Sequence, residues 1–182
     1  MAHRDNTVRR TADKRFYLRR ETDFSEIVRN GDSPLNYTWT VKSKDGSTTE
    51  YAAIAHDERG NIVQWGVSSV TDIHGNNLTY RYETEGGLAC ISEINYTGFG
   101  SEAGVYKVRF IRAADSENSR SDVTTNARLG FLQTDKAQLK SIEIFYKDEL
   151  LRSYKFNYAQ GVFNKTMLSA VTETDGGRNE LY

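Results

Sequence analysis

The chain consists largely of short segments in which apolar and polar residues alternate. A period of two is that of a β-strand, whose successive side chains point to opposite faces of a sheet. No segment keeps the longer period of an amphipathic helix, so the pattern predicts strands along most of the chain. The predicted strands cover residues 15–20, 24–29, 36–43, 48–54, 62–70, 77–83, 88–95, 105–112, 139–147, 151–159 and 168–173.

Short glycine-containing turns separate many of the predicted strands. Glycine and asparagine adopt positive φ at little cost and so permit tight reversals between antiparallel strands. Parallel pairing would need long, usually helical crossovers, and the sequence contains no helical segment to supply them. We therefore expect an all-β fold, an antiparallel meander of about ten or more strands. The turn dipeptides are Asp45-Gly46, Gly60-Asn61, Gly75-Asn76, Gly86-Gly87 and Gly176-Gly177.

Two segments interrupt the alternation. Residues 1–14 are basic and predict a flexible N-terminal arm, whereas residues 15–182 are expected to form one β-rich domain. Within that domain, residues 113–138 are polar apart from a small apolar cluster, and they predict a long polar loop. Such a loop is compatible with a partner-facing role and with a passive surface role. The apolar cluster consists of Leu129, Phe131 and Leu132.

Composition narrows the functional classes. Hydrophobic residues make up 37% of the 182 residues and aromatic residues 12%, a profile that suits half-buried strands. The single cysteine, Cys90, excludes a disulfide framework within the chain. The formal net charge of -1 gives no general attraction for nucleic acid or for an anionic membrane. No apolar run reaches membrane-spanning length, and the first residues lack the hydrophobic centre of a signal peptide.

Candidate catalytic and metal-binding residues are sparse. The three histidines are isolated, and no spacing places two imidazoles on one metal. Asp72 with His74 could contribute to a mixed metal site, but solvated hairpin turns commonly contain such residues. Phosphate-binding and nucleophile motifs are also lacking. We therefore expect no catalytic residue, no metal and no cofactor.

Aromatic residues two positions apart form the strongest pattern. A stripe with this spacing lines one face of a sheet, where it usually packs, although an exposed stripe could bind sugars. Trp39 and Trp65 each centre a predicted strand and are expected to be buried in one aromatic layer. The stripe comprises Trp39, Tyr51, Trp65, Tyr80, Tyr82, Tyr106, Tyr146, Tyr154, Phe156 and Tyr158.

Several short motifs, taken in order, resemble the Salmonella plasmid virulence protein B family. They are W-x-V-x-x-K-D-G from Trp39, W-x-V-x-x-V-x-D-x-x-G-N-x-x-x-Y-x-Y from Trp65, then L-x-S-I, R-S-Y-x-F-x-Y and L-S-A-V-T-E. The resemblance covers about residues 15–174 and extends to the B components of insecticidal toxin complexes, which are related to Rhs (tyrosine-aspartate repeat) proteins. The matching positions are Trp39, Asp45, Gly46, Tyr51, Trp65, Asp72, Gly75, Asn76, Tyr80 and Tyr82.

The resemblance implies a structural role. Larger members of the family are secreted assemblies in which β-strand strips form a shell around a toxic C-terminal polypeptide. This chain would be a non-catalytic strip of such a shell, within a larger secreted or cell-surface protein, and its partners would be other segments or subunits of the assembly. It departs from the pattern at Gly66, where an aromatic residue is usual, and it contains neither propeller repeats nor a toxic domain.

The alternative function is a β-sheet module that binds a cell-surface glycan or a partner protein. Neither hypothesis involves nucleic acid or membrane insertion by this segment. If the chain is a strip of a larger sheet, its terminal strands, near residues 16–20 and 168–173, are expected to be exposed edges.

Overall fold

The computed structural model describes residues 2–3, 14–18, 20, 22–114 and 120–182. Most of the expected N-terminal arm, residues 1 and 4–13, lies outside the described residues. The described part contains fourteen strands and one short 3-10 turn, η1 (Val162–Asn164). The strands are β1 (Ala2–His3), β2 (Lys14–Tyr17), β3 (Glu26–Asn30), β4 (Thr38–Lys42), β5 (Thr48–His56), β6 (Ile62–Thr71), β7 (Asn76–Glu85), β8 (Leu88–Phe99), β9 (Tyr106–Arg112), β10 (Thr124–Asn126), β11 (Gln133–Asp135), β12 (Leu139–Tyr146), β13 (Glu149–Gln160) and β14 (Thr166–Asp175).

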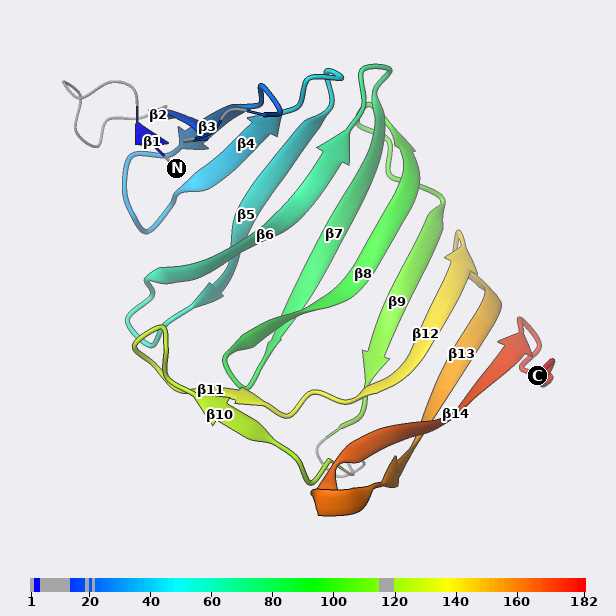
Figure 1. Cartoon of the computed structure of the whole chain (residues 1–182). Coiled ribbons are helices and arrows are strands. Elements are labelled where there is room, and N and C mark those ends of the chain that lie inside the picture. The colour runs from blue at the N-terminus through cyan, green and yellow to red at the C-terminus, as the bar shows by residue number, and fades with distance from the viewer. Residues whose placement is uncertain (1, 4–13, 19, 21, 115–119) are drawn as a thin grey trace.

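Twelve of these strands form one antiparallel sheet (Figure 1). Its order is β1-β2-β3-β4-β5-β6-β7-β8-β9-β12-β13-β14, so each strand pairs with its neighbour in sequence except where β10 and β11 leave the sheet. This arrangement confirms the predicted all-β meander. Each predicted segment overlaps a strand of the sheet, whereas β1, β10 and β11 were not predicted. With two or three residues each, these strands are too short to show a period.

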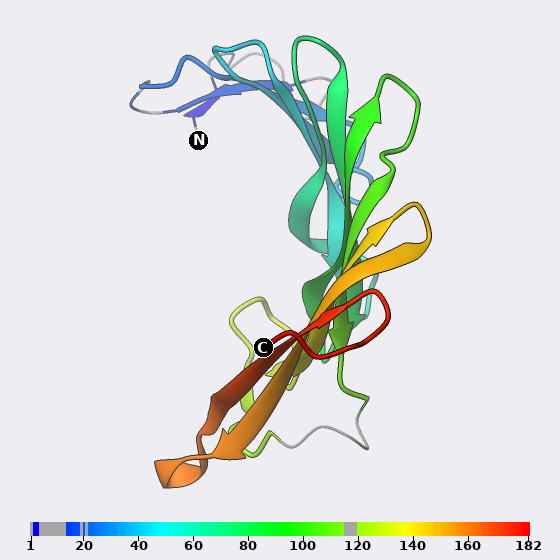
Figure 2. The same cartoon turned by 90° about the vertical axis from the view of Figure 1, so that its right-hand side faces the viewer.

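The sheet is strongly curved. Register shifts, which mark β-bulges, interrupt the pairing of β5 with β6, β7 with β8, β9 with β12, β12 with β13 and β13 with β14. A bulge bends its strand and increases the local twist. In Figure 2 the strands near both ends of the sheet bend toward the same side, which is the side seen in Figure 1. The sheet therefore has a concave face and a convex face.

The sheet forms a single layer without a conventional core. Among the described residues, only Ile27, Tyr37 and Ala55 are buried apolar residues, and no large side chain is completely buried. The chain exposes 12168 Å² of accessible surface, whereas a compact monomer of 20.7 kDa exposes about 8,900 Å². Stable domains usually bury one sheet face against a second layer, and no described segment of this chain supplies that layer.

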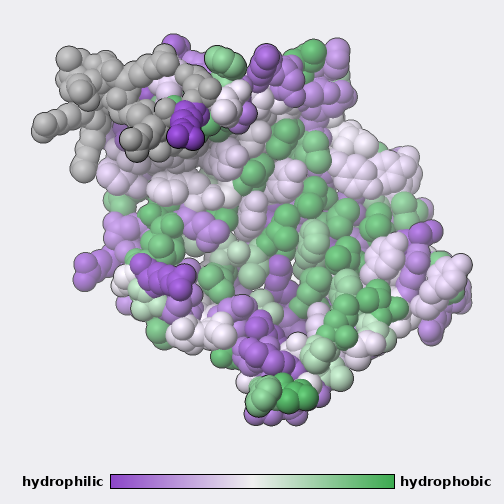
Figure 3. All heavy atoms as spheres, in the orientation of Figure 1, coloured by the Kyte–Doolittle hydropathy of each residue, from purple (hydrophilic) through white to green (hydrophobic). Residues whose placement is uncertain are grey.

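Apolar side chains nevertheless gather on one face. Tyr80, Ile94, Val108 and Ile144 lie opposite one another on four neighbouring strands, and each is half-buried. Figure 3 views the concave face and shows hydrophobic residues over its middle strands. Such a row stabilises the sheet through cross-strand contacts while leaving much of its apolar surface open.

The segment 113–138 is not simply a polar loop, as the sequence suggested. Its β10 and β11 form a short antiparallel hairpin, which docks on the turn between β7 and β8. Thr134 N donates to Gly86 O at 2.7 Å, and Gln133 Nε2 donates to Gly87 O at 3.1 Å. In the apolar cluster of this segment, Phe131 is half-buried, whereas Leu129 and Leu132 are exposed.

The two edges of the sheet differ from each other. The expected edge near residues 16–20 is wrong, because β1 pairs with β2 at Phe16 and Tyr17. At the other end β14 is an edge strand, as predicted. Its last residues are covered by the C-terminal tail, since Glu173 N donates to Tyr182 O and Asp175 N donates to Asn179 O. The first part of β14, residues 166–172, is the exposed edge.

Candidate functional site

The turn between β6 and β7 contains three of the predicted motif residues and is closed by its own hydrogen bonds. Asp72 N donates to Asn76 O at 2.9 Å, and Asp72 Oδ1 accepts from the backbone N–H groups of His74 and Asn76. The Asn76 side chain donates to Asp72 Oδ2 at 2.7 Å, and Gly75 adopts φ +88°. The hydrogen bond from the Asn76 side chain contributes most to holding the pKa of Asp72 below its ordinary value of 3.8. The polar groups of this turn therefore serve the hairpin corner.

The same five-residue corner occurs four times among the described residues, at 43–47, 57–61, 72–76 and 175–179. In each corner the first residue's N–H donates to the fifth residue's C=O, and the fourth residue's N–H donates to the first residue's C=O. The fourth residue has positive φ in all four corners. It is glycine in the first three corners, but it is Arg178, with φ 64°, in the last. A non-glycine residue costs about 1 kcal/mol there.

Asp45 and Gly46 belong to the first of these corners. Asp45 Oδ1 accepts from the Ser47 N–H at 2.9 Å and from the Ser47 hydroxyl at 2.7 Å. A Cβ atom on Gly46 would overlap the Ile73 side chain, so the corners at 43–47 and 72–76 lie against each other. Both motif residues thus act in the turn and in its packing.

Trp39 and Trp65 share an aromatic cluster, as predicted, but they are not largely buried. Their rings meet edge to face with centroids 6.2 Å apart, and Phe16 lies 5.2 Å from Trp39. Trp65 Nε1 donates to Tyr37 O at 2.6 Å. Both tryptophans are only half-buried, because a single-layer sheet offers no second layer to cover them.

Tyr51, Tyr80 and Tyr82 belong to the region where β6 and β7 separate. These strands pair only at three positions, from Ser69↔Thr79 to Thr71↔Asn77, and Figure 1 shows them diverging below that point. Burial raises the pKa of Tyr82, and the phenols of Tyr80 and Tyr51 add to the shift.

The missing aromatic residue at position 66 has a steric explanation in the same region. A Cβ atom on Gly66 would lie 2.6 Å from Ile54 Cδ1 and 3.0 Å from the Tyr82 ring. Contacts this short do not occur without displacement of a neighbour. Gly66 therefore leaves the space that the side chains of Ile54 and Tyr82 fill.

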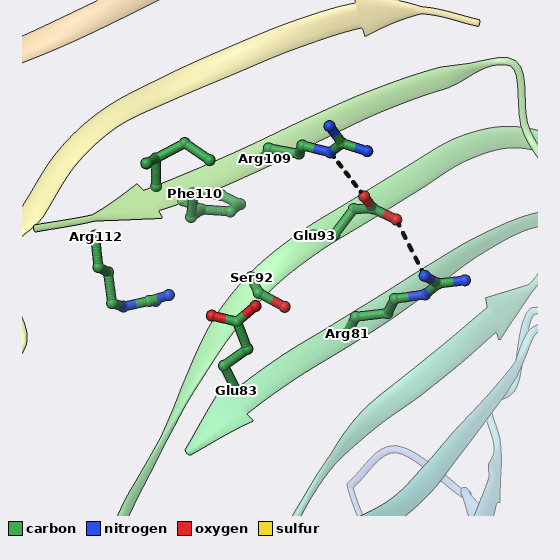
Figure 4. A pocket seen from close by; sticks show the side chains of 8 residues that line it. Arg81, Glu83, Ser92, Glu93, Arg109, Phe110 and Arg112 are labelled. Carbon is green, nitrogen blue, oxygen red and sulfur yellow. Dashed lines mark hydrogen bonds and ion pairs between the residues drawn. The ribbon is translucent and has the colours of Figure 1, made fainter. Parts of the chain in front are cut away.

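The opposite face of the middle strands is charged. Arg81, Glu93, Arg109 and Glu143 occupy consecutive strands at paired positions. Figure 4, which views the sheet from the side opposite to Figure 1, shows the Glu93 carboxylate between two arginines. Its oxygens lie 3.1 Å from Arg109 Nε and 3.8 Å from Arg81 Nη1.

Glu93 remains ionised in this arrangement. Burial raises its pKa, but hydrogen bonds from Asn95 and Arg109 and the nearby charges of Lys107 and Arg81 lower it, so the pKa of Glu93 lies below its ordinary value of 4.5. Arg81, Glu93 and Arg109 line a hollow of about 360 Å³, together with Glu83, Ser92, Phe110, Ile111 and Arg112. The arrangement resembles an ion-pair ladder that links three strands, and it lacks a paired acid and base aimed at a common point.

The described residues contain no obvious metal site. No group of three or more histidine, cysteine, aspartate or glutamate side chains among them could hold a metal ion. In the same residues, no helix is long and apolar enough to cross a membrane. Cys90 is a free, half-buried thiol on β8.

A compact polar network fastens the segment after residue 119 to the end of the sheet. Arg120 binds Asp122 at 3.2 Å and Asp135 at 2.9 Å, and the Thr166 hydroxyl donates to Asp122 Oδ1 at 2.8 Å. The hydrogen bond from Thr166 is the largest of the contacts that lower the pKa of Asp122 to about 2. Sequence reasoning missed this network, because its members are far apart in the chain and follow no motif.

Comparisons with known proteins support the fold. No family model matches the chain, and no curated protein matches it in sequence. The fold is similar to the N-terminal domain of the effector protein SpvB from Salmonella typhimurium strain LT2, with a TM-score of 0.72 and 15% identity over 90% of this chain and 69% of that domain. It is also similar to TcdB2-TccC3, with a TM-score of 0.74 and 13% identity over 97% of this chain.

The chain spans only 12% of the length of TcdB2-TccC3. At these identities the likeness shows a shared fold, which agrees with the resemblance carried by the sequence motifs. Seven of the motif residues contribute to that fold in these ways: Asp45, Gly46, Asp72, Gly75 and Asn76 form corners, and Trp39 and Trp65 belong to a cross-strand aromatic cluster.

Proposed function

We propose that this chain is a non-catalytic structural module of a secreted toxin-delivery protein of the insecticidal toxin complex B or Rhs-like type. Its sheet would form part of the β-shell that encases a toxic C-terminal polypeptide. The single observation that carries this proposal is the single-layer sheet, which has no large, completely buried side chain among the described residues. The fold shared with SpvB and TcdB2-TccC3 supports the same role.

The large accessible surface area is the physical argument for this proposal. The accessible surface of 12168 Å² exceeds the area of a compact monomer of this mass by about 3,000 Å². That excess is comparable to the area buried in large permanent interfaces between subunits. A sheet that is part of a shell would cover it with neighbouring segments and with enclosed polypeptide.

The partners in this proposal are other segments or subunits of the same assembly, and the protein would act outside the producing cell. A β-shell needs continuous strand pairing along its wall. The exposed part of β14 provides a strand edge on which such pairing could continue.

The alternative is a β-sheet module that binds a cell-surface glycan or a partner protein. The observation that favours it is the docked β10–β11 hairpin, whose Leu129 and Leu132 are 51% and 67% exposed beside the sheet. A surface of this kind suits a protein partner better than a sugar, because sugars need flat aromatic faces and several hydrogen-bonding groups.

The experiment compares the chain alone with the chain co-expressed with the segments encoded on either side of it. Binding of a hydrophobic dye reports open apolar surface, and light scattering reports association. The shell role predicts strong dye binding by the isolated chain and loss of that binding when the flanking segments are present. A monomer without dye binding would contradict the shell role, and retention by a glycan array or by one host protein would support the alternative.

Catalysis is tested on the same preparations. We expect no hydrolase and no transferase activity from the isolated chain, because no acid, base and nucleophile converge among the described residues. Turnover of a sugar or nucleotide substrate that is abolished by a substitution in the hollow of Figure 4 would contradict the non-catalytic role.

A further inference from the structure

A second hollow, of about 370 Å³, lies beside the ion-pair ladder on the same face of the sheet. It shares Ile111 and Arg112 with the first hollow and extends over β12 and β13. The size is in the range of sites for small ligands. Ser141, Glu143 and Ser153 form its half-buried floor.

The rim of this hollow is basic. Four cationic side chains line it, Arg112, Lys140, Lys155 and Arg178, against the single carboxylate of Glu143. The concentration is local, because the whole chain has 24 basic and 25 acidic residues. Lys155 and Arg178 form no ion pair with any described residue.

The two arginines of this rim differ from each other. Arg112 is directed away from β12 and β13, since its Nη2 donates to Ile91 O on β8 and Figure 4 shows its side chain turned toward Ser92 and Glu83. Arg178 adopts φ 64° at the corner position that is glycine in the three other corners. A strained backbone conformation is a feature that clusters at binding sites. The hairpin does not need a strained residue at this position, since glycine closes the three other corners.

We propose that this hollow binds a phosphate or sulfate ester group. Such a group presents three terminal oxygens, and charge-assisted hydrogen bonds to guanidinium and ammonium groups are its strongest contacts. Lys155 and Arg178 provide cationic donors, and the hydroxyls of Ser141 and Ser153 provide neutral ones. A carboxylate has only two oxygens and would leave more of these donors unused.

Glu143 determines which end of the hollow can hold an anion. Its carboxylate lies in the floor and faces Arg109 on the neighbouring strand, so it repels an anion that approaches that end. The ester group is therefore held at the end formed by Lys155 and Arg178. This inference does not rest on the proposed shell role, since the isolated chain contains the whole hollow.

Calorimetric titration of the isolated chain tests the site with two probes, inorganic tripolyphosphate and a sulfated disaccharide. We expect saturable binding with Kd below about 1 mM to at least one probe. The probe that binds tighter distinguishes a phosphate source from a sulfate source. Arg178→Gly and Lys155→Gln should each weaken binding by about tenfold, which corresponds to the loss of one charge-assisted contact. Glu143→Gln should strengthen it.

Arg178→Gly separates binding from folding, because it restores the residue of the other corners and should leave the melting temperature unchanged or higher. Arg59→Gln is the matched control, since Arg59 is an exposed arginine of the 57–61 corner, away from the hollow. It removes the same charge and should leave the affinity unchanged. Absence of binding, an equal loss in the Arg59 variant, or equally tight binding of polyglutamate would overturn the proposal.

Discussion

At the scale of single residues, the glycines of the corners have different physical roles from the glycine of the strand. Gly75 has positive φ, and the nearest atom to a Cβ there would be Phe99 Cε2 at an ordinary 3.6 Å. The requirement at position 75 is therefore one of backbone conformation. Gly66 has no positive φ, and the requirement there is one of space.

The first residue-scale prediction concerns the backbone of a corner. Gly75→Val should lower the free energy of unfolding by about 1 kcal/mol or more, because a β-branched residue is strained at positive φ. Chemical denaturation measures the change. Gly60→Val is the matched control, since Gly60 has φ +80° and no atom within 4 Å of a Cβ. A similar loss in both variants identifies backbone strain, and an unchanged midpoint for Gly75→Val would refute it.

The second residue-scale prediction concerns space between β6 and β7. Gly66→Ala should destabilise the chain by about 1–3 kcal/mol through overpacking, since its Cβ meets Ile54 Cδ1. Ile54→Val removes that methyl group, so the double variant should recover part of the loss in a double-mutant cycle. Strict additivity of the two changes would show that the contact does not limit this position.

At the scale of elements, pH should control the stability of the contact between the start of β14 and the segment that follows residue 119. The pKa of Asp122 is about 2 in the folded chain and 3.8 ordinarily, so its contribution is complete above about pH 4 and is lost as pH falls toward 2. Hydrogen exchange at Thr166 should therefore accelerate over that interval.

The Asp122→Asn variant is the control for this prediction. Other aspartates with lowered pKa, such as Asp57 and Asp175, also respond to acid, so only the difference between wild type and variant reports Asp122. We expect faster exchange in the variant at neutral pH and a smaller further change on acidification. Identical profiles for both proteins would contradict a role of Asp122 in holding this end of the sheet.

At the scale of the whole molecule, the exposed strand edge and open faces should cause self-association. Met167, Leu168 and Val171 on β14 are 57%, 53% and 46% exposed, and no proline or lysine within β14 protects this edge. Light scattering should show association that increases with concentration. Val171→Lys should reduce it, whereas Val162→Lys, at an exposed apolar residue outside the strands, should not. Equal effects of the two variants would assign association to general hydrophobicity.

The sequence alone determined the class of fold and the place of the turns. Alternation depends on each residue and its nearest neighbours, so the strands of the meander are visible in the chain itself. The corner at Asp72, Gly75 and Asn76 was predictable for the same reason, because an aspartate, a glycine and an asparagine within five residues supply most of the bonds that close it. Short strands such as β10, with three residues, give too little pattern to be recognised.

Only the tertiary structure decided which residues of neighbouring strands lie opposite each other. The Glu93 carboxylate meets Arg81 and Arg109 because of the register of three strands, and bulges shift that register in ways that alternation does not encode. The basic hollow required Arg178, from the corner after β14, to lie beside Arg112 from β9. The half-burial of Trp39 and Trp65 also depended on the number of layers. A sequence pattern tells which side chains share a face of a strand, but it does not tell whether anything covers that face.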